Sequence, residues 1–146
     1  FASTSMLRAA LEKLFGTNGG QSGLAVNVMS FGFKYGLPLE ADLVMDVRFL
    51  PNPFYVEGLK QQSGLDQPVQ DYLNSFPVTH TFEEKLFDLL GFLLPHYVEE
   101  GKSILTLAIG CTGGRHRSVA LTHAAAAWLR EQGYTVSEYH RDMTRT

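Results

Sequence analysis

Residues 104–118 read Ile-Leu-Thr-Leu-Ala-Ile-Gly-Cys-Thr-Gly-Gly-Arg-His-Arg-Ser. The mostly apolar residues at 104–109 are typical of a buried strand, and the alanine-rich stretch at 119–132 is typical of a helix. A glycine-bearing turn joins the two. Such a turn places unpaired backbone N–H groups and the positive end of a helix dipole at one point. This stretch therefore predicts an α/β unit with an anion site at the turn.

The side chains of the turn point to the same chemistry. They are hydrogen-bond donors or cations, and they comprise Thr112, Arg115, His116, Arg117 and Ser118. The guest expected beside them is a phosphate ester. We expect His116 and Arg117 to face this site rather than the core. Gly113-Gly114 could instead form only a tight structural turn, and the residues alone leave that alternative open.

Three further strands are predicted outside this stretch. Residues 24–31 and 43–49 combine alternation with β-branched side chains, and residues 135–140 follow the turn at Gly133. The strand–helix–strand order over 104–140 forms one parallel crossover unit. The expected fold class is therefore α/β, with a largely parallel sheet flanked by helices.

Helical spacing of apolar residues predicts a helix over 6–15 and a second one whose apolar face spans 82–94. Thr81 and Glu84 form a capping-box pattern before the second helix, and Pro95 should end or kink it. A short helix is expected to start near Pro68.

Ligands in parallel sheets bind beyond the carboxyl ends of the strands. The predicted strand ends and the loops after them carry charged or small residues, namely Ser30, Gly32, Lys34, Asp46, Arg48, Asn52, Cys111 with the turn after it, His140 and Arg141. We expect these residues to gather at one edge of the sheet. Alternatives stay open: Asp46 and Arg48 could form a plain ion pair, Lys34 could be a solvated charge, and Pro51-Asn52-Pro53 could be only a rigid loop.

Composition limits the possible functions. The chain has 146 residues, enough for one domain with a proper core, and its net charge is −3. No global positive field would draw it to nucleic acid or an anionic membrane, so an anion site must be local. The single cysteine suits a reducing cytoplasm, and His80, His96 and His123 lack metal-ligand spacing, so no metal site is expected. No run is long enough to cross a membrane, and no signal peptide opens the chain.

Cys111 admits a catalytic alternative. Cys111, five intervening residues, Arg117 and Ser118 fit the signature loop of cysteine-dependent phosphatases, and a cysteine at a helix N-terminus beside cations favours thiolate. A phosphatase also needs an acid for the leaving oxygen, for which Asp46 and Asp142 are the only guesses. The expectation is a binding domain rather than an enzyme, with Cys111 lining a phosphate pocket.

Four motifs in order resemble the C-terminal domain of the RapZ/YvcJ family of bacterial RNase adapter and nucleotide-binding proteins. They are Ser30-Phe31-Gly32-Phe33-Lys34-Tyr35-Gly36, Asp46-Val47-Arg48-Phe49-Leu50-Pro51-Asn52-Pro53, Ser63-Gly64-Leu65-Asp66, and Gly110 to Ser118. The resemblance runs from about residue 4 to the end. It implies a phosphofructokinase-like three-layer domain over residues 17–146, preceded at 1–16 by a connector helix from a missing N-terminal domain. The chain begins with Phe1, as expected of a piece of a longer protein.

The resemblance also implies a ligand. Domains of this family sense glucosamine-6-phosphate, so a phosphorylated amino sugar or a sugar nucleotide is expected. Thr112, Gly113, Gly114, His116, Arg117 and Ser118 would then hold the phosphate. Ser30, Asp46, Arg48 and Asn52 would contact hydroxyls or the amine. ATP or GTP is expected only in the missing P-loop domain, so this part of the protein needs no cofactor.

Family members further imply a small RNA, an endoribonuclease and a homo-oligomer as partners. Two departures bear on this. Phe54 stands where enterobacterial members carry a pocket histidine, and the basic tail those members use for RNA is represented here by Arg141 and Arg145, with Asp142 opposing them.

Overall fold

The computed structural model describes residues 23–145. Its elements are β1 (Ala25–Gly32), the 3₁₀ turn η1 (Phe33–Tyr35), β2 (Leu43–Asp46), the 3₁₀ turn η2 (Pro53–Tyr55), α2 (Gln67–Asn74), α3 (Pro77–Glu99), β3 (Ile104–Cys111), α4 (Arg117–Glu131) and β4 (Thr135–His140). The helix predicted over 6–15 and the connector at 1–16 lie outside the described residues.

The four strands form one sheet in the order β2-β3-β1-β4, and every neighbouring pair is parallel. β1 pairs with β3 from Ala25 opposite Ile104 to Gly32 opposite Cys111. Because β1 lies between β3 and β4, the turn after β3 ends directly beside the turn after β1. The α/β fold with a parallel sheet is thus confirmed.

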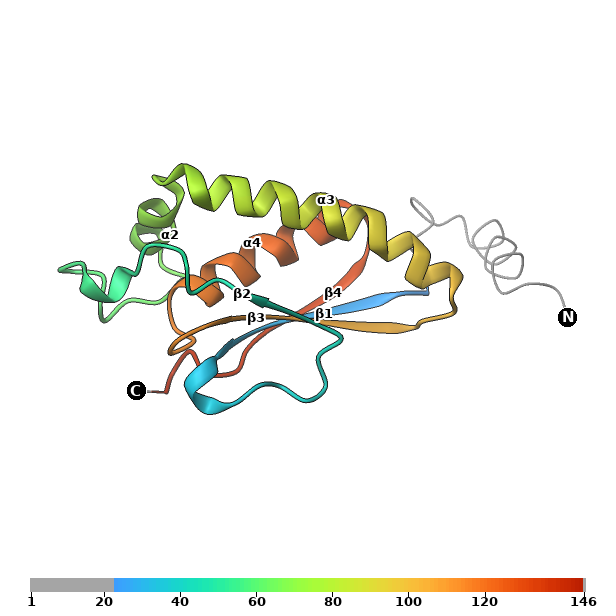
Figure 1. Ribbon diagram of the computed structural model, residues 1–146, viewed down its shortest axis with the longest axis horizontal. Coiled ribbons are helices and arrows are strands. Elements are labelled where there is room, and N and C mark those ends of the chain that lie inside the picture. Colours follow the sequence, from blue (N-terminus) through green and yellow to red (C-terminus); the bar gives the residue numbers. More distant parts are fainter. Residues whose placement is uncertain (1–22, 146) are drawn as a thin grey trace, which may run out of the picture.

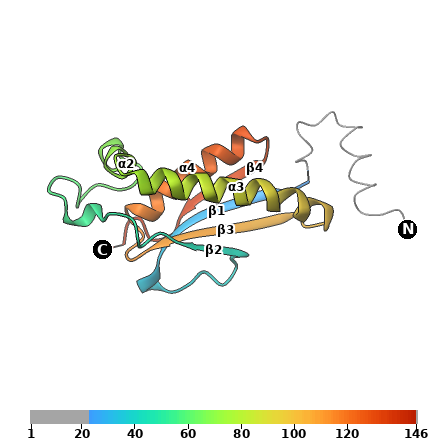
Figure 2. The ribbon, with the colours of Figure 1, turned by 45° about the horizontal axis from the view of Figure 1, so that its top comes forward.

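The three α-helices lie over the same face of the sheet (Figures 1 and 2). The main core fills the space between them and contains Val28, Leu107 and Ile109 from the strands and Leu90 and Leu94 from α3. On the other face, Met29, Phe31 and Ala108 form a smaller cluster under the segment after β1. Within the described residues no α-helix covers that face, so this part of the chain shows two layers of the three implied by the family resemblance.

Two predicted elements differ from the structure by three residues or more at one end. β2 ends at Asp46 rather than at residue 49, because the Arg48 N–H donates to Asp46 Oδ1 at 2.9 Å and turns the chain. α3 begins at Pro77, four residues before Thr81, with proline at a position that needs no N–H. Thr81 is therefore not a cap, and its hydroxyl donates to the Pro77 carbonyl inside the helix.

Pro95 does not end α3, which continues to Glu99. A proline removes one intrahelical hydrogen bond, here the bond to the carbonyl of Gly91. Leu94 and Val98 on either side of Pro95 are buried in the core. Their burial holds the last turn of the helix in place.

Candidate anion-binding site

The turn between β3 and α4 occupies residues 112–116 and lies against the end of β1. The Lys34 N–H donates to the Thr112 carbonyl at 3.2 Å. A Cβ added at Gly32 would lie 2.5 Å from the backbone carbon of Gly113, so only glycine permits this approach. Gly114 has φ +81, the left-handed region that favours glycine. These glycines allow the backbone of the turn to pack directly against the backbone at the end of β1.

Cys111 and Ser118 lie beneath the turn. The Cys111 Sγ donates to Ser118 Oγ at 3.1 Å and accepts from the Gly114 N–H at 3.3 Å. Both residues are buried. This contact fixes the last residue of β3 against the first turn of α4, so it sets where the backbone N–H groups of the turn point.

Arg115 and His116 hold the loop over residues 60–62 beside the turn. Arg115 Nε donates to the Gln62 carbonyl at 3.1 Å, and Arg115 Nη2 donates to the Gln61 carbonyl. His116 Nε2 lies 3.1 Å from the Lys60 carbonyl oxygen, which can only accept. Burial lowers the pKa of His116, opposed by the Lys60 hydrogen bond and assisted by the charge of Arg115. The imidazole is therefore a neutral donor near pH 7.

Arg117 is the first residue of α4, and its side chain reaches the segment after β2. Its Nη1 donates to the Arg48 carbonyl at 2.7 Å and to the Leu50 carbonyl at 3.1 Å. Arg117 is 5% exposed and His116 is 6% exposed. Both side chains line the pocket, and both are also buried and donate structural hydrogen bonds.

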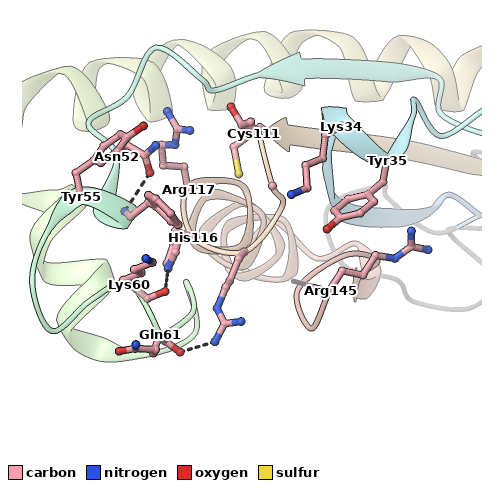
Figure 3. Close-up of a pocket in the computed structure, with 14 residues that line it drawn as sticks. Lys34, Tyr35, Asn52, Tyr55, Lys60, Gln61, Cys111, His116, Arg117 and Arg145 are labelled. Carbon is pink, nitrogen blue, oxygen red and sulfur yellow. Dashed lines mark hydrogen bonds between the residues drawn. The ribbon is translucent and has the colours of Figure 1, made fainter.

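A cavity of about 500 Å³ lies over the turn. Its wall comprises Lys34, Tyr35, Asn52, Phe54, Tyr55, Lys60, Gln61, Cys111, Thr112, Gly113, Arg115, His116, Arg117 and Arg145. Figure 3 shows Lys34 reaching toward the turn from one side, and Tyr55 and Lys60 on the other side. Among the residues described, the wall contains lysines and arginines but no aspartate or glutamate. This one-sided charge suits an anion and disfavours a cation.

The predicted site residues fall into three groups: those that line the pocket, those buried beneath or behind it, and those outside its wall. Lys34, Asn52, Cys111, Thr112, Gly113, His116 and Arg117 line the pocket. Beneath or behind the pocket lie two glycines, Gly32 and Gly114, that allow the close backbone approach, and two buried serines, Ser30 and Ser118. The Ser30 hydroxyl lies 2.8 Å from His140 Nδ1. This contact ties β1 to β4, and His140 Nε2 in turn lies 2.7 Å from Glu138 Oε2 of the same strand.

Asp46 and Arg48 are placed outside the pocket wall. Arg48 Nη2 donates to Asp46 Oδ2 at 2.7 Å, and the Arg48 guanidinium stacks on the Phe33 ring at 4.0 Å. The hydrogen bond from Arg48 lowers the pKa of Asp46, with burial acting in the opposite direction. The ion-pair alternative therefore describes their contacts.

Arg141 and Arg145 meet at a buried carboxylate. Asp142, which is fully buried, accepts from the Gly32 N–H and from Arg141 Nη2, each at 2.8 Å, and its Oδ1 forms an ion pair with Arg145 Nε at 3.1 Å. Arg145 also lines the pocket, whereas Arg141 does not. Sequence reasoning treated Asp142 as an opposing surface charge and missed this anchoring role, because only the fold brings it to the end of β1.

Five other wall residues were not predicted as contacts: Tyr35, Phe54, Tyr55, Lys60 and Gln61. The sequence analysis noted Phe54 only because enterobacterial family members carry a pocket histidine at this position. Tyr35 follows Lys34 directly, and Tyr55 follows the Pro51-Asn52-Pro53 loop, so adjacency to predicted residues was the signal available. Lys60 and Gln61 had no such signal.

No group of three or more His, Cys, Asp or Glu side chains that could hold a metal ion occurs among residues 23–145. In the same part of the chain, no helix is both long and apolar enough to cross a membrane.

A parallel sheet whose carboxyl edge carries a cation-lined pocket, with a glycine turn entering a helix, defines an α/β domain with a candidate anion site. The model of the family described as RapZ C-terminal domain matches residues 24–144, and the chain belongs to this family.

Curated relatives agree with this assignment. The chain is 56% identical over 139 residues to a nucleotide-binding protein of Symbiobacterium thermophilum, covering 95% of this chain and 46% of the relative. It is 52% identical to a nucleotide-binding protein of Carboxydothermus hydrogenoformans and 55% identical to one of Limosilactobacillus reuteri, in each case covering 95% of this chain and 48% of the relative. The chain thus spans about half the length of the curated relatives it matches.

Proposed function

We propose that this domain is a regulatory module that senses a phosphorylated amino sugar of the glucosamine-6-phosphate type. The observation that carries the proposal is the charge of the pocket wall. Five lysine and arginine side chains line the pocket, and no aspartate or glutamate is among the described residues of its wall: Lys34, Lys60, Arg115, Arg117 and Arg145 are the five cations. A phosphate group would sit on the backbone of the turn at 112–114, which leads into the N-terminus of helix α4 at Arg117.

The rest of the sugar would meet neutral polar groups. Asn52 and Gln61 line the pocket and offer amide oxygens, and Tyr35 and Tyr55 offer hydroxyls. An amine of the ligand would bind to these acceptors rather than to Asp46, which is paired with Arg48 outside the wall. We therefore expect the phosphate to supply most of the affinity and the amine to supply a smaller preference.

The test is calorimetric titration with glucosamine-6-phosphate, glucose-6-phosphate and inorganic phosphate. The proposal expects micromolar binding of the amino sugar phosphate and weaker binding of the other two. Lys34→Ala should weaken binding, whereas Arg130→Ala should not, since Arg130 pairs with Glu138 at the far end of α4. Equal weak binding of all three compounds would leave only a general anion pocket, and no binding of any would refute the proposal.

A second candidate is an adapter that binds small RNA and presents it to an endoribonuclease. The observation that favours it is the position of Arg145, which is 53% exposed in its side chain and lies 4.8 Å from the Tyr35 ring. Such a cation–aromatic pair suits a single-stranded nucleotide. This candidate expects affinity for RNA that falls steeply with added salt. Flat salt dependence, or no binding at low salt, would exclude it.

Phosphatase chemistry is the third candidate. The contact between Cys111 and Ser118 resembles what a cysteine nucleophile needs, yet within the described residues no carboxylic acid lines the pocket to protonate a leaving oxygen. We therefore propose binding rather than turnover, and expect Cys111→Ser to retain the ligand.

A further inference from the structure

The pocket has an aromatic component that a sugar phosphate does not require. Phe54 and Tyr55 lie at one side of it, with ring centroids 5.3 Å apart and planes at 90°. Tyr55 is 82% exposed, so a large part of its ring is open to the pocket and the solvent beside it. Large exposed rings beside a polar pocket are typical platforms for flat ligand groups.

Cations stand on both sides of the turn. Lys60 Nζ lies 4.7 Å from the Phe54 ring, on the side that also carries Tyr55. Lys34 Nζ and the Arg145 guanidinium lie 5.2 Å and 4.8 Å from the Tyr35 ring on the opposite side (Figure 3). A phosphate held by the turn leaves Lys34 and Arg145 for a second phosphate, whereas Lys60 lies on the Phe54 side, next to the place of a flat ligand group. A ligand with two phosphates fits the charge distribution better.

The size of the cavity agrees with a larger ligand. Its volume of about 500 Å³ lies within the range of pockets that enclose drug-sized molecules. The wall amides of Asn52 and Gln61 provide neutral partners for the hydroxyls of a ribose or the edge of a base.

We propose that this pocket binds a nucleoside diphosphate, either free or as part of a nucleotide sugar. The diphosphate lies over the turn at 112–114 and beside Lys34, and the base stacks on Tyr55 next to Phe54. This inference rests on the proposed function because both use the same anion-binding turn. It adds a nucleotide-binding role for this half of the protein, carried by residues of this domain alone.

The test is calorimetric titration of the domain with ADP, pyrophosphate and ribose 5-phosphate in the absence of metal. ADP is expected to bind about tenfold more tightly than pyrophosphate, since stacking of one base typically contributes a gain of this order. Tyr55→Ala should remove this advantage and leave pyrophosphate binding unchanged. Tyr55→Phe should retain the advantage, because the ring remains.

Tyr139→Ala is the matched control, since Tyr139 is an exposed tyrosine, 58% accessible, on β4 and outside the pocket wall. It should change neither affinity. Equal affinity for ADP and pyrophosphate, or an unchanged ADP affinity in Tyr55→Ala, would overturn the inference.

The same titrations separate this inference from the proposed function. Binding of glucosamine-6-phosphate without any preference for ADP over pyrophosphate overturns the inference and leaves the sugar-phosphate sensor intact. ADP binding that depends on Tyr55, without glucosamine-6-phosphate binding, supports the inference and refutes the amino-sugar ligand. No binding of pyrophosphate, ADP or sugar phosphate refutes both.

Discussion

Arg117 lines the anion pocket while donating to the carbonyl groups of Arg48 and Leu50 in the segment after β2. His116 similarly lines the pocket and holds the Lys60 carbonyl. At the scale of the residue, each of these two side chains therefore lines the pocket and also holds a neighbouring segment in place. Alanine substitutions at these two positions would disturb the loops of the pocket as well as its charge, so Lys34 is the cleaner probe of ligand contact.

Gly32→Ala should destabilise the domain by about 1–3 kcal/mol, the usual cost of inserting a methyl group where none fits. The added Cβ would meet the backbone of Gly113 at 2.5 Å, and backbone cannot move aside as a flexible side chain can. Urea unfolding measures the loss. Gly113→Ala is the matched control because a Cβ there has no heavy atom within 4 Å. Similar midpoints for the two variants would contradict the close approach of β1 to the turn.

His116 should make the stability of the domain depend on pH. Burial lowers the pKa of His116 below its ordinary value of 6.5, so the unfolded chain binds this proton more readily than the folded one. The stabilising contribution of the neutral ring is fully present above about pH 6.5 and is lost as pH falls through the lowered value.

His116→Gln keeps a donor for the Lys60 carbonyl without titrating. The unfolding free energy of this variant should therefore fall less between pH 7 and pH 5 than that of the parent, as measured by urea unfolding at both values. Equal losses in the two proteins would mean that His116 takes up its proton freely in the folded state.

At the scale of the element, α3 shows how packing overrides local signals. Its sequence contains Gly91 and Pro95, both unfavourable inside a helix, and its mid-sequence capping pattern at Thr81 and Glu84 is not used. Buried leucines at 86, 90 and 94 fix the helix on the core and carry it through both positions. Tertiary contact thus decided where this helix begins and ends.

Gly91→Ala should stabilise α3 by about 0.5–1 kcal/mol, because alanine restricts the unfolded chain and favours the helix. A Cβ at this position would meet only the Trp128 ring, at an ordinary distance of 3.9 Å. The midpoint of thermal unfolding should rise. A lower midpoint would show that the ring of Trp128 has no room for the methyl group.

At the scale of the whole molecule, four parallel strands deliver their following segments to one edge of the sheet. The pocket collects residues after β1, after β2, after β3 and after β4, although they are far apart in the sequence. The buried carboxylate of Asp142 ties the segment after β4 to Gly32 and positions Arg145 at the wall. The sheet therefore assembles a site that no single segment contains.

Occupancy of this pocket should stabilise the whole domain. Pyrophosphate present at one hundred times its dissociation constant should raise the unfolding free energy by about 2.7 kcal/mol, since a ligand bound only to the folded state shifts the equilibrium by mass action. Thermal unfolding measures this against sodium chloride of matched ionic strength. Lys34→Ala should need more pyrophosphate for the same shift. A shift equal to that produced by sodium chloride would indicate ionic strength rather than binding.

The sequence by itself determined the four strands and their parallel arrangement, and it predicts an anion site at the turn after β3. These are local properties: apolar runs, glycines and adjacent donors lie within a few residues of one another. It also indicated the edge of the sheet where Lys34, Asn52 and the turn meet, because parallel strands end together.

Only the tertiary structure decided which side chains reach the pocket. Asp46 and Arg48 follow a strand end, as the sequence pattern of the site requires, but they pair with each other outside the wall. Lys60 and Gln61 reach the wall in a loop whose carbonyls accept long-range hydrogen bonds from Arg115 and His116. Arg145 reaches it in a segment whose Asp142 accepts a long-range hydrogen bond from the Gly32 N–H. Local sequence fixes the chemistry that each residue offers. The direction of a side chain and its partners depend on segments distant in the chain, which only folding brings into contact.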